Sequence, residues 1–202
     1  MPTEVVGGSI AIYKDVWPNV SSTIALFEKI VKLDEQEPVE QNRFFQPATV
    51  KPDNTGSLLS QERTNSHMSL SHGGTRNEQI RLVNNYFSDI MMSALWSYTE
   101  QFSIREKILE NESLVVLRYQ TGEEYKAHYD GGTQTKRSVS VILYLNDDYE
   151  GGEIEFVNFG IKIKPEAGTF LIFPSGYAYR HIAHPVTSGT KYAIVTWLHD
   201  QP

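Results

Sequence analysis

From residue 113 onward, short stretches of alternating side chains follow one another, and this pattern constrains the fold more than any other feature of the chain. The stretches are rich in β-branched and aromatic residues: LVVLRY, SVSVILYL, GEIEFV, IKIKP, GTFLIFP and KYAIVTWL. Glycine-containing segments separate them, namely QTGEE, DYEGG, PEAGT and TSGT. Many short strands with regular turns are typical of a sandwich, a jelly roll or a barrel.

The first half of the chain has a different pattern. Residues 8–17 predict an opening strand, and residues 20–33 predict a helix that Ser21 or Ser22 could cap. Residues 77–99 predict a longer helix, because apolar residues recur there at helical spacing. Residues 34–75 are polar and rich in Asn, Gln, Ser, Pro and Gly, which is typical of a functional lid or a poorly ordered segment.

Helices followed by strands indicate an α+β chain in which the helices pack on one outer face of the sheets. We therefore predict an α+β fold with a double-stranded β-helix (jelly-roll) core and supporting N-terminal helices. The predicted single domain spans residues 1–202. Within it, residues 1–112 form an N-terminal strand, helices and the lid-like segment, and residues 113–202 form the jelly-roll core.

The composition narrows the classes of function. With 202 residues, of which 40% are hydrophobic, the chain can bury a normal core. A net charge of -7 argues against sequence-independent binding of nucleic acid, and the lack of cysteine excludes disulfides and thiolate chemistry. The chain starts without the pattern of a secretory signal and has no run of roughly 18 to 20 apolar residues. We therefore expect a cytoplasmic protein that does not enter a membrane.

A possible metal site begins at His128 and Asp130. Residues two apart in an extended strand point to the same side, so both side chains could hold one ion while Tyr129 points away. Imidazole with carboxylate suits Fe(II), Mn(II) or Zn(II). His181 and His184 are both candidates for the third ligand, and the residues alone leave that choice open.

Lys191 begins the last apolar strand of the chain. By strand parity it shares a face with Ala193, Val195 and Trp197, where a buried ammonium group would need an anionic partner. Parity alone favours a solvent-exposed lysine at the strand end, and the nearby metal site favours a salt bridge to a dicarboxylate. Tyr144 lies on the hydroxyl-bearing face of SVSVILYL, and we expect that face to line a pocket.

These motifs occur in one order along the chain. The order is RY-x2-G-x2-Y-x2-H-x-D, R-x6-YLN, EGGE, P-x2-G-x4-FP and H-x3-PV-x2-G-x-K-x5-W, from residue 118 to residue 197. The series resembles the prolyl 4-hydroxylase-like family of Fe(II)- and 2-oxoglutarate-dependent dioxygenases, and the opening strand IAIYKDVWP resembles it more loosely.

The resemblance implies a role for each matching residue. It selects His181 as the third metal ligand beside His128 and Asp130, and these three are also the implied catalytic residues. It implies that Lys191 forms a salt bridge with 2-oxoglutarate. It implies that Tyr144 and Tyr119 contact the cosubstrate. It also implies that Arg137 and Trp197 contact the substrate.

The resemblance also implies a reaction, namely hydroxylation of a C–H bond with release of succinate and CO2. A prolyl residue in a peptide or protein is the expected substrate, and Fe(II), 2-oxoglutarate, O2 and ascorbate are the expected cofactors. Three alternatives remain at this point: hydroxylation of another side chain or a free amino acid, a zinc-dependent hydrolase, and a non-catalytic jelly-roll binding module. The hydrolase would need a general base, for which Glu153 and Glu155 are candidates.

Overall fold

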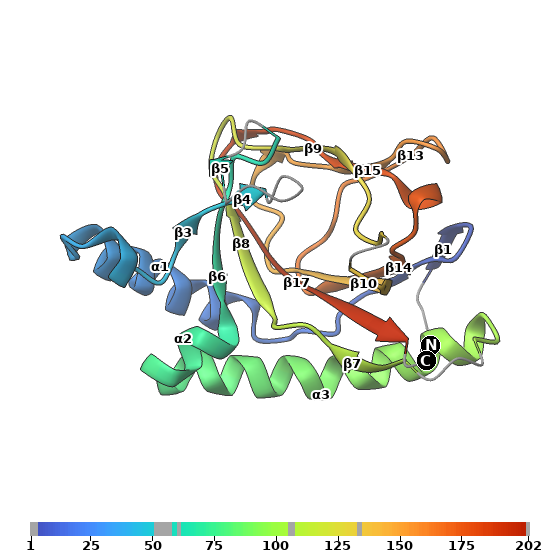
Figure 1. The fold of residues 1–202 in the computed structure, drawn as a ribbon, viewed down its shortest axis with the longest axis horizontal. Helices are drawn as coiled ribbons and strands as arrows, with labels where there is room; N and C mark the ends of the chain where they lie inside the picture. The colour runs from blue at the N-terminus through green and yellow to red at the C-terminus, as the bar shows by residue number, and fades with distance from the viewer. Residues whose placement is uncertain (1–3, 51–57, 60–61, 105–107, 133–134, 201–202) are drawn as a thin grey trace.

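The alternating stretches form the strands of two facing antiparallel sheets in the computed structural model, which describes residues 4–50, 58–59, 62–104, 108–132 and 135–200 (Figure 1). The larger sheet has nine strands in the order β1-β2-β14-β10-β17-β8-β6-β3, with β7 paired to β17. The smaller sheet has four strands in the order β13-β12-β15-β9. These two sheets are the jelly-roll core that the sequence predicts.

The bounds of the elements before residue 112 are β1 (Glu4–Gly7), β2 (Ile10–Tyr13), α1 (Val20–Gln36), η1 (Glu40–Asn42), β3 (Gln46–Pro47), β4 (Thr49–Val50), β5 (Leu58–Leu59), β6 (Ser66–Ser69), α2 (Leu70–Arg76), α3 (Glu78–Gln101) and β7 (Ile108–Asn111). The later elements are β8 (Val115–Tyr119), β9 (Tyr125–His128), β10 (Arg137–Tyr144), β11 (Glu150–Gly151), β12 (Ile154–Phe156), β13 (Ile161–Ile163), β14 (Thr169–Pro174), η2 (Tyr177–Tyr179), β15 (His181–Ala183), β16 (Val186–Ser188) and β17 (Lys191–Asp200).

The helices cover the face of the larger sheet that is turned away from the smaller sheet (Figure 1). The helical spacing of apolar residues in α1 and α3 buries Phe27 and Phe87 completely in the core between helices and sheet. Phe87 meets Phe170 of β14 edge to face, with ring centroids 5.2 Å apart. Burying an aromatic side chain of this size stabilises the fold by about 1.5–3 kcal/mol. The helices therefore fix one face of the sheet, and its other face is left to form the interior of the jelly roll.

The helix starts are capped differently from one another. Asn77 caps α3, because its side-chain oxygen accepts from the amides of Gln79 and Ile80. The prediction that Ser21 or Ser22 caps α1 is wrong. The N-cap is Asn19, which makes no side-chain capping bond, and Ser22 instead donates to the carbonyl of Asn19.

Part of the segment predicted as a loop or lid belongs to the regular structure. Strand β6 pairs with β8 in the larger sheet, and α2 follows it directly. The opening strand is also more complex than predicted, since β1 and β2 form a hairpin at the edge of the same sheet. A role of residues 34–75 as a lid stays a prediction, and residues 51–57 and 60–61 of this segment lie outside the described residues. The single-domain division likewise stays a prediction.

Candidate metal centre and cosubstrate cavity

Three side chains that are distant in sequence meet at one end of the smaller sheet. His128 ends β9, Asp130 lies two residues later, and His181 begins β15, which pairs with β9 so that the two histidines are register partners. Nε2 of His128 lies 3.7 Å from Oδ1 of Asp130, and Nε2 of His181 lies 3.9 Å from Oδ2. The possible ligand atoms all lie within 4.8 Å of one another. This spacing fits a single metal ion that contacts all three.

Backbone carbonyls orient both imidazoles. Nδ1 of His128 lies 2.7 Å from the carbonyl oxygen of Lys126, and Nδ1 of His181 lies 3.0 Å from that of Tyr179. A carbonyl can only accept, so each Nδ1 carries the proton and donates it. Each Nε2 therefore keeps its lone pair free for a metal, which is the usual arrangement around a bound ion.

Asp130 is held by a neighbouring strand of the other sheet. The predicted extended geometry ends at His128, because Asp130 lies in a bend beyond β9. Ser140 of β10 donates to Oδ2 of Asp130 at 2.6 Å, and its hydroxyl lies 2.8 Å from that of Ser175. Gly131 makes the approach possible, since a Cβ atom there would lie only 2.6 Å from the carbonyl oxygen of Arg137.

The protonation states suit metal binding. Burial, followed by the neighbouring His181, lowers the pKa of His128 to about 4. Burial alone would raise the pKa of Asp130, but the two imidazoles and the Ser140 hydroxyl outweigh it and the pKa is lowered. At neutral pH the site therefore offers a neutral His128 and an ionised Asp130, the forms in which both residues bind metals.

Lys191 lies in the interior between the two sheets and is 3% exposed. Its ammonium group donates to the carbonyl of Gly152 at 2.5 Å, the one hydrogen bond that it makes with the described residues. The rings of Tyr144, Tyr119 and Tyr149 surround it at 5.1, 5.5 and 5.8 Å. Burial and then the charge of Lys164 lower the pKa of Lys191 to about 7. An ammonium group this poorly compensated would gain from an anionic ligand.

Two tyrosines complete this end of the interior. Tyr119 of β8 and Tyr144 of β10 are both buried. Burial raises the pKa of Tyr119 to about 12 and raises the pKa of Tyr144 well above its ordinary value. Both hydroxyls therefore stay protonated at neutral pH and can donate to an anion.

The metal-binding residues and the buried lysine line one cavity of about 160 Å³. The parity prediction for β17 is confirmed, because its alternate residues line this cavity together. All eight residues proposed from the sequence belong to the lining: His128, Asp130, His181, Lys191, Tyr144, Tyr119, Arg137 and Trp197. The cavity thus presents metal ligands in one part and a cation with two hydroxyl donors in another.

Arg137 and Trp197 form an ordered pair beside the metal centre. The guanidinium carbon of Arg137 lies 3.7 Å from the centre of the Trp197 ring. Glu112 holds Arg137 from the other side with two hydrogen bonds of 2.6 Å, and His199 lies 3.1 Å from the same carboxylate. Glu112 could not be assigned to the site from the sequence, because no spacing relates it to Arg137 and the folded arrangement of the strands brings the two residues together.

Arg63 and Tyr125 also line the cavity, although the sequence did not assign them to the site. Tyr125 stacks on the ring of His128 with centroids 3.5 Å apart, and Arg63 lies over Tyr125 at 5.0 Å. Arg63 comes from the segment predicted as a loop and forms an isolated bridge with Tyr125. The Y-x2-H spacing was a visible signal for Tyr125, whereas no local pattern marked Arg63.

His184 takes another partner. Its Nε2 lies 2.7 Å from Oε2 of Glu155, and it does not belong to the three-residue cluster. Among the described residues that line the metal cavity, neither Glu153 nor Glu155 is present, which leaves the hydrolase alternative without its candidate base there.

The sequence of this chain matches a known family model. Residues 114–199 match the 2OG-Fe(II) oxygenase superfamily. A probable prolyl 4-hydroxylase of Arabidopsis thaliana is 35% identical over 119 residues, covering 45% of this chain and 41% of the relative. A PKHD-type hydroxylase of Rippkaea orientalis is 38% identical over 95 residues, covering 43% of this chain and 42% of the relative. The chain therefore spans less than half the length of these relatives.

Solved structures share the fold over nearly the whole chain. A prolyl hydroxylase from Trichoplax adhaerens, in complex with a hypoxia inducible factor peptide fragment, aligns with a TM-score of 0.71 at 20% identity, covering 95% of this chain and 84% of that one. A viral collagen prolyl hydroxylase from Paramecium Bursaria Chlorella virus-1, in its 2OG complex, aligns with a TM-score of 0.63 at 19% identity, covering 97% and 98%. At such identities the likeness supports the fold. None of the described helices is both long and apolar enough to cross a membrane.

Proposed function

Because the C-terminal half of this chain belongs to the 2OG-Fe(II) oxygenase superfamily, with prolyl hydroxylase-like relatives, we propose that the protein is an Fe(II)- and 2-oxoglutarate-dependent prolyl hydroxylase. One observation carries the proposal. The cluster of His128, Asp130 and His181 lines the same small cavity as the buried, poorly compensated ammonium group of Lys191. A metal ion and a dicarboxylate would each have their partners in that one cavity.

His128, Asp130 and His181 would hold Fe(II). Two imidazoles and one carboxylate are the ligand set with which non-haem iron oxygenases leave coordination positions open. Iron held by these residues would supply the activation of oxygen that accompanies decarboxylation of 2-oxoglutarate. The carbonyls of Lys126 and Tyr179 keep both Nε2 atoms aimed at the ion, and Ser140 keeps Asp130 from turning away.

Lys191, Tyr144 and Tyr119 would hold the far carboxylate of 2-oxoglutarate. Lys191 provides a charge-assisted contact, and the two tyrosines provide neutral hydroxyl donors. Apolar side chains, including Leu117 and Val195, line the remaining walls and keep bulk water from the reacting atoms. This arrangement favours a dianion of fixed length over neutral metabolites.

The substrate peptide would lie across the mouth formed by Arg137, Trp197 and Arg63. Glu112 fixes Arg137 over Trp197, so the two present a rigid cation and a flat ring to the substrate. The relatives named prolyl 4-hydroxylase support a prolyl residue as the target. Peptide substrates and a role for ascorbate are parts of the proposal that rest on the resemblance. A cytoplasmic location is a further part of the proposal.

The test has two stages. Without oxygen, Fe(II) and 2-oxoglutarate added to the protein should give the visible charge-transfer band of the chelated cosubstrate, and Asp130→Ala should give none. With oxygen, proline-rich peptides should gain one oxygen atom by mass spectrometry while succinate forms. A band with oxidation of another side chain would make the protein a different hydroxylase. Bound metal without a band would favour a zinc hydrolase or a binding module.

A further inference from the structure

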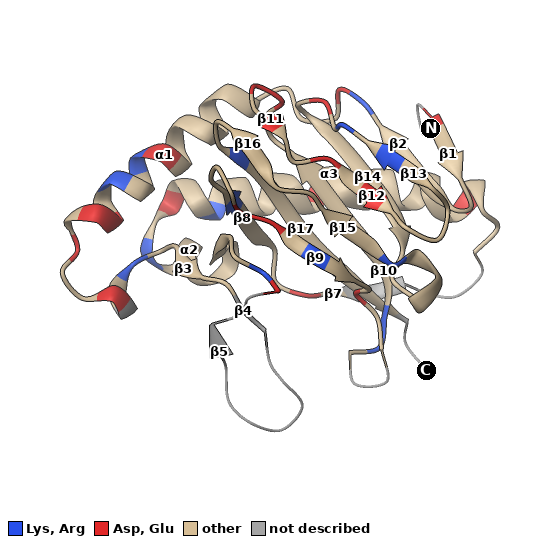
Figure 2. Cartoon of the chain, turned by 90° about the horizontal axis from the view of Figure 1, so that it is seen from above, with Lys and Arg blue, Asp and Glu red and all other residues tan. Residues whose placement is uncertain are grey.

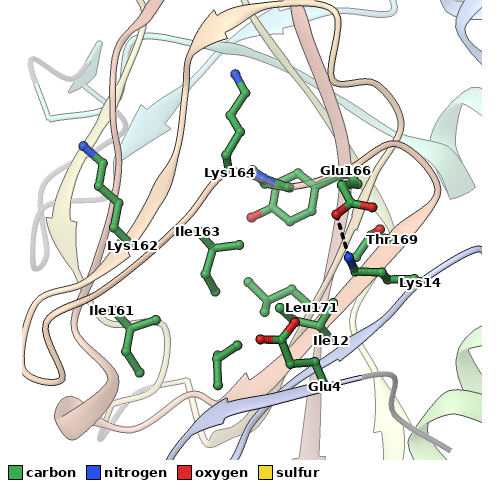
Figure 3. Close-up of a pocket in the computed structure, with 13 residues that line it drawn as sticks. Glu4, Ile12, Lys14, Ile161, Lys162, Ile163, Lys164, Glu166, Thr169 and Leu171 are labelled. Carbon is green, nitrogen blue, oxygen red and sulfur yellow. Dashed lines mark hydrogen bonds and ion pairs between the residues drawn. The ribbon is translucent and has the colours of Figure 1, made fainter.

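A second cavity opens between the edges of the two sheets, away from the metal centre. It has a volume of about 290 Å³ and lies between β13 on one side and β1, β2 and β14 on the other (Figure 3). Its size is near the lower end of pockets that bind small molecules, about 300–1,000 Å³. Of the described lining residues, Tyr144 is the one that the two cavities share.

The middle of this second cavity is aliphatic. Ile161 and Ile163 face it from the smaller sheet, and Ile12 and Leu171 face it from the larger sheet (Figure 3). The side chain of Lys164 leads away from these four residues and donates to the carbonyls of Tyr149 and Gly151, at 2.7 Å each. A ligand in this space would therefore need an apolar body.

The inner end of the cavity has two hydroxyl groups on one face of the larger sheet. Tyr144 and Thr169 are direct register partners on β10 and β14, so their side chains lie side by side. Thr169 is 4% exposed, and its buried hydroxyl has no hydrogen-bond partner among the residues that the structure describes. A buried hydroxyl without a partner costs about 1–3 kcal/mol of stability. The Thr169 hydroxyl is thus a donor available to a ligand.

The charges favour an acid at the inner end. The ammonium groups of Lys164 and Lys191 lie 3.8 and 5.8 Å from the centre of the Tyr149 ring, and Lys191 lies 5.1 Å from the Tyr144 ring. The Lys191 ammonium group therefore lies near the Tyr144 side of the cavity. The two acidic residues that line the cavity, Glu4 and Glu166, are exposed, and Glu166 pairs with Lys14 at 2.6 Å.

We propose that this second cavity binds a small carboxylic acid with an aliphatic body. The carboxylate accepts from the hydroxyls of Thr169 and Tyr144, and the chain lies between Ile161, Ile163 and Leu171. A primary amine in the same orientation would place its charge near the ammonium group of Lys191, so the site discriminates against amines.

Occupation of this site has a consequence for the metal cavity. Tyr144 forms the wall between the second cavity and the metal cavity. When the Tyr144 hydroxyl donates to an acid in the second cavity, it can no longer donate to 2-oxoglutarate. By thermodynamic linkage the acid and 2-oxoglutarate then weaken the binding of each other by the same factor. This consequence rests on the proposed role of Tyr144 in cosubstrate binding, whereas the binding site itself does not.

Isoleucine methyl groups can report which cavity is occupied. Ile12, Ile161 and Ile163 line the second cavity, whereas Ile142 and Ile154 line the metal cavity. We would titrate hexanoate into the full 202-residue protein, labelled at the isoleucine δ-methyl groups and free of metal, and record methyl NMR spectra. Saturable shifts confined to the first three residues are expected. Shifts only at Ile142 and Ile154, or no shifts, would overturn the proposal.

Two comparisons test the chemistry of the site. Thr169→Val keeps the shape of the side chain but removes the hydroxyl, so the Kd for hexanoate should rise about tenfold. Thr187→Val, on exposed β16, should leave the Kd unchanged. Equal affinity of the wild type and Thr169→Val would overturn the placement of the carboxylate, and so would equal affinity for hexanoate and hexanol. Unchanged methyl signals of Ile30 and Ile194 in the core establish that the variant is folded.

Discussion

The pH dependence of 2-oxoglutarate binding should follow the titration of Lys191. The ammonium group is buried and has a pKa of about 7 in the protein without cosubstrate. The dianion binds the charged form, so binding draws a proton onto Lys191 wherever that residue is neutral in the free protein. The affinity for 2-oxoglutarate should therefore fall as pH rises through 7. If protonation of the metal ligands limited binding, the affinity would instead rise with pH.

The size of the change in 2-oxoglutarate affinity follows from the pKa of Lys191. With a pKa of about 7, Lys191 is about nine-tenths charged at pH 6 and about one-tenth charged at pH 8. The apparent Kd of 2-oxoglutarate should consequently rise about tenfold between these two values. His128 does not contribute in this range, because burial lowers its pKa to about 4.

Anaerobic titration of the Fe(II)-loaded protein with 2-oxoglutarate at pH 6, 7 and 8 would measure this Kd through the charge-transfer band. Calorimetry in two buffers with different ionisation heats would count the protons taken up, which should approach one at pH 8. Lys191→Arg is the matched control, because a guanidinium group stays charged throughout. The affinity of this variant for 2-oxoglutarate will differ from that of the wild type, but it should not vary with pH between 6 and 8. A pH dependence caused by titration of the metal ligands would remain in the variant. An equally steep dependence in wild type and Lys191→Arg would refute the reasoning.

Three further outcomes follow from the contacts of the metal centre and of Lys191. Ser140→Ala should weaken metal binding by about 10- to 100-fold in a calorimetric titration, because Asp130 loses the hydroxyl that orients it; unchanged affinity would show that packing alone positions Asp130. His181→Ala should abolish turnover and charge transfer while His184→Ala retains most of both, and equal losses would contradict the choice of ligand. Lys191→Met should raise the Tm of the cosubstrate-free protein at pH 7 by at least about 2 °C, because it removes a buried group with a depressed pKa. The wild type should approach the variant in stability as pH rises from 7 toward 10, since the unfolded chain binds more protons in that window.

The sequence predicted what alternation and helical spacing can encode. In β17 the alternation placed Lys191 and Trp197 on the same face, and both line the metal cavity. In α3 the helical spacing identified the buried stripe that includes Phe87. Each of these features depends on the side of a strand or helix on which a residue lies. The sequence of that strand or helix determines this side.

Contacts between elements could not be predicted in the same way. Alternation shows that Ser140 faces the interior, but the contact with Asp130 depends on how the bend after β9 lies against β10. The bridge of Arg63 with Tyr125 joins a polar segment to the metal-binding strand. The residues alone left both His181 and His184 as candidates for the third ligand, and the resemblance to the dioxygenase family was needed to choose between them.

The burial of Lys191 connects the fold with the proposed function. Between two sheets of apolar side chains an ammonium group opposes folding. The one hydrogen bond that Lys191 makes within the described part of the chain, to the carbonyl of Gly152, compensates only part of its lost hydration. A methionine of similar length would serve the fold better. Binding of a dianion in the cavity would explain the buried lysine, because the salt bridge between them forms in a medium of low dielectric constant, where it is strongest. Lys191→Met should therefore separate the requirements of folding from those of cosubstrate binding. The same variant should be more stable than the wild type and should lose the binding of 2-oxoglutarate.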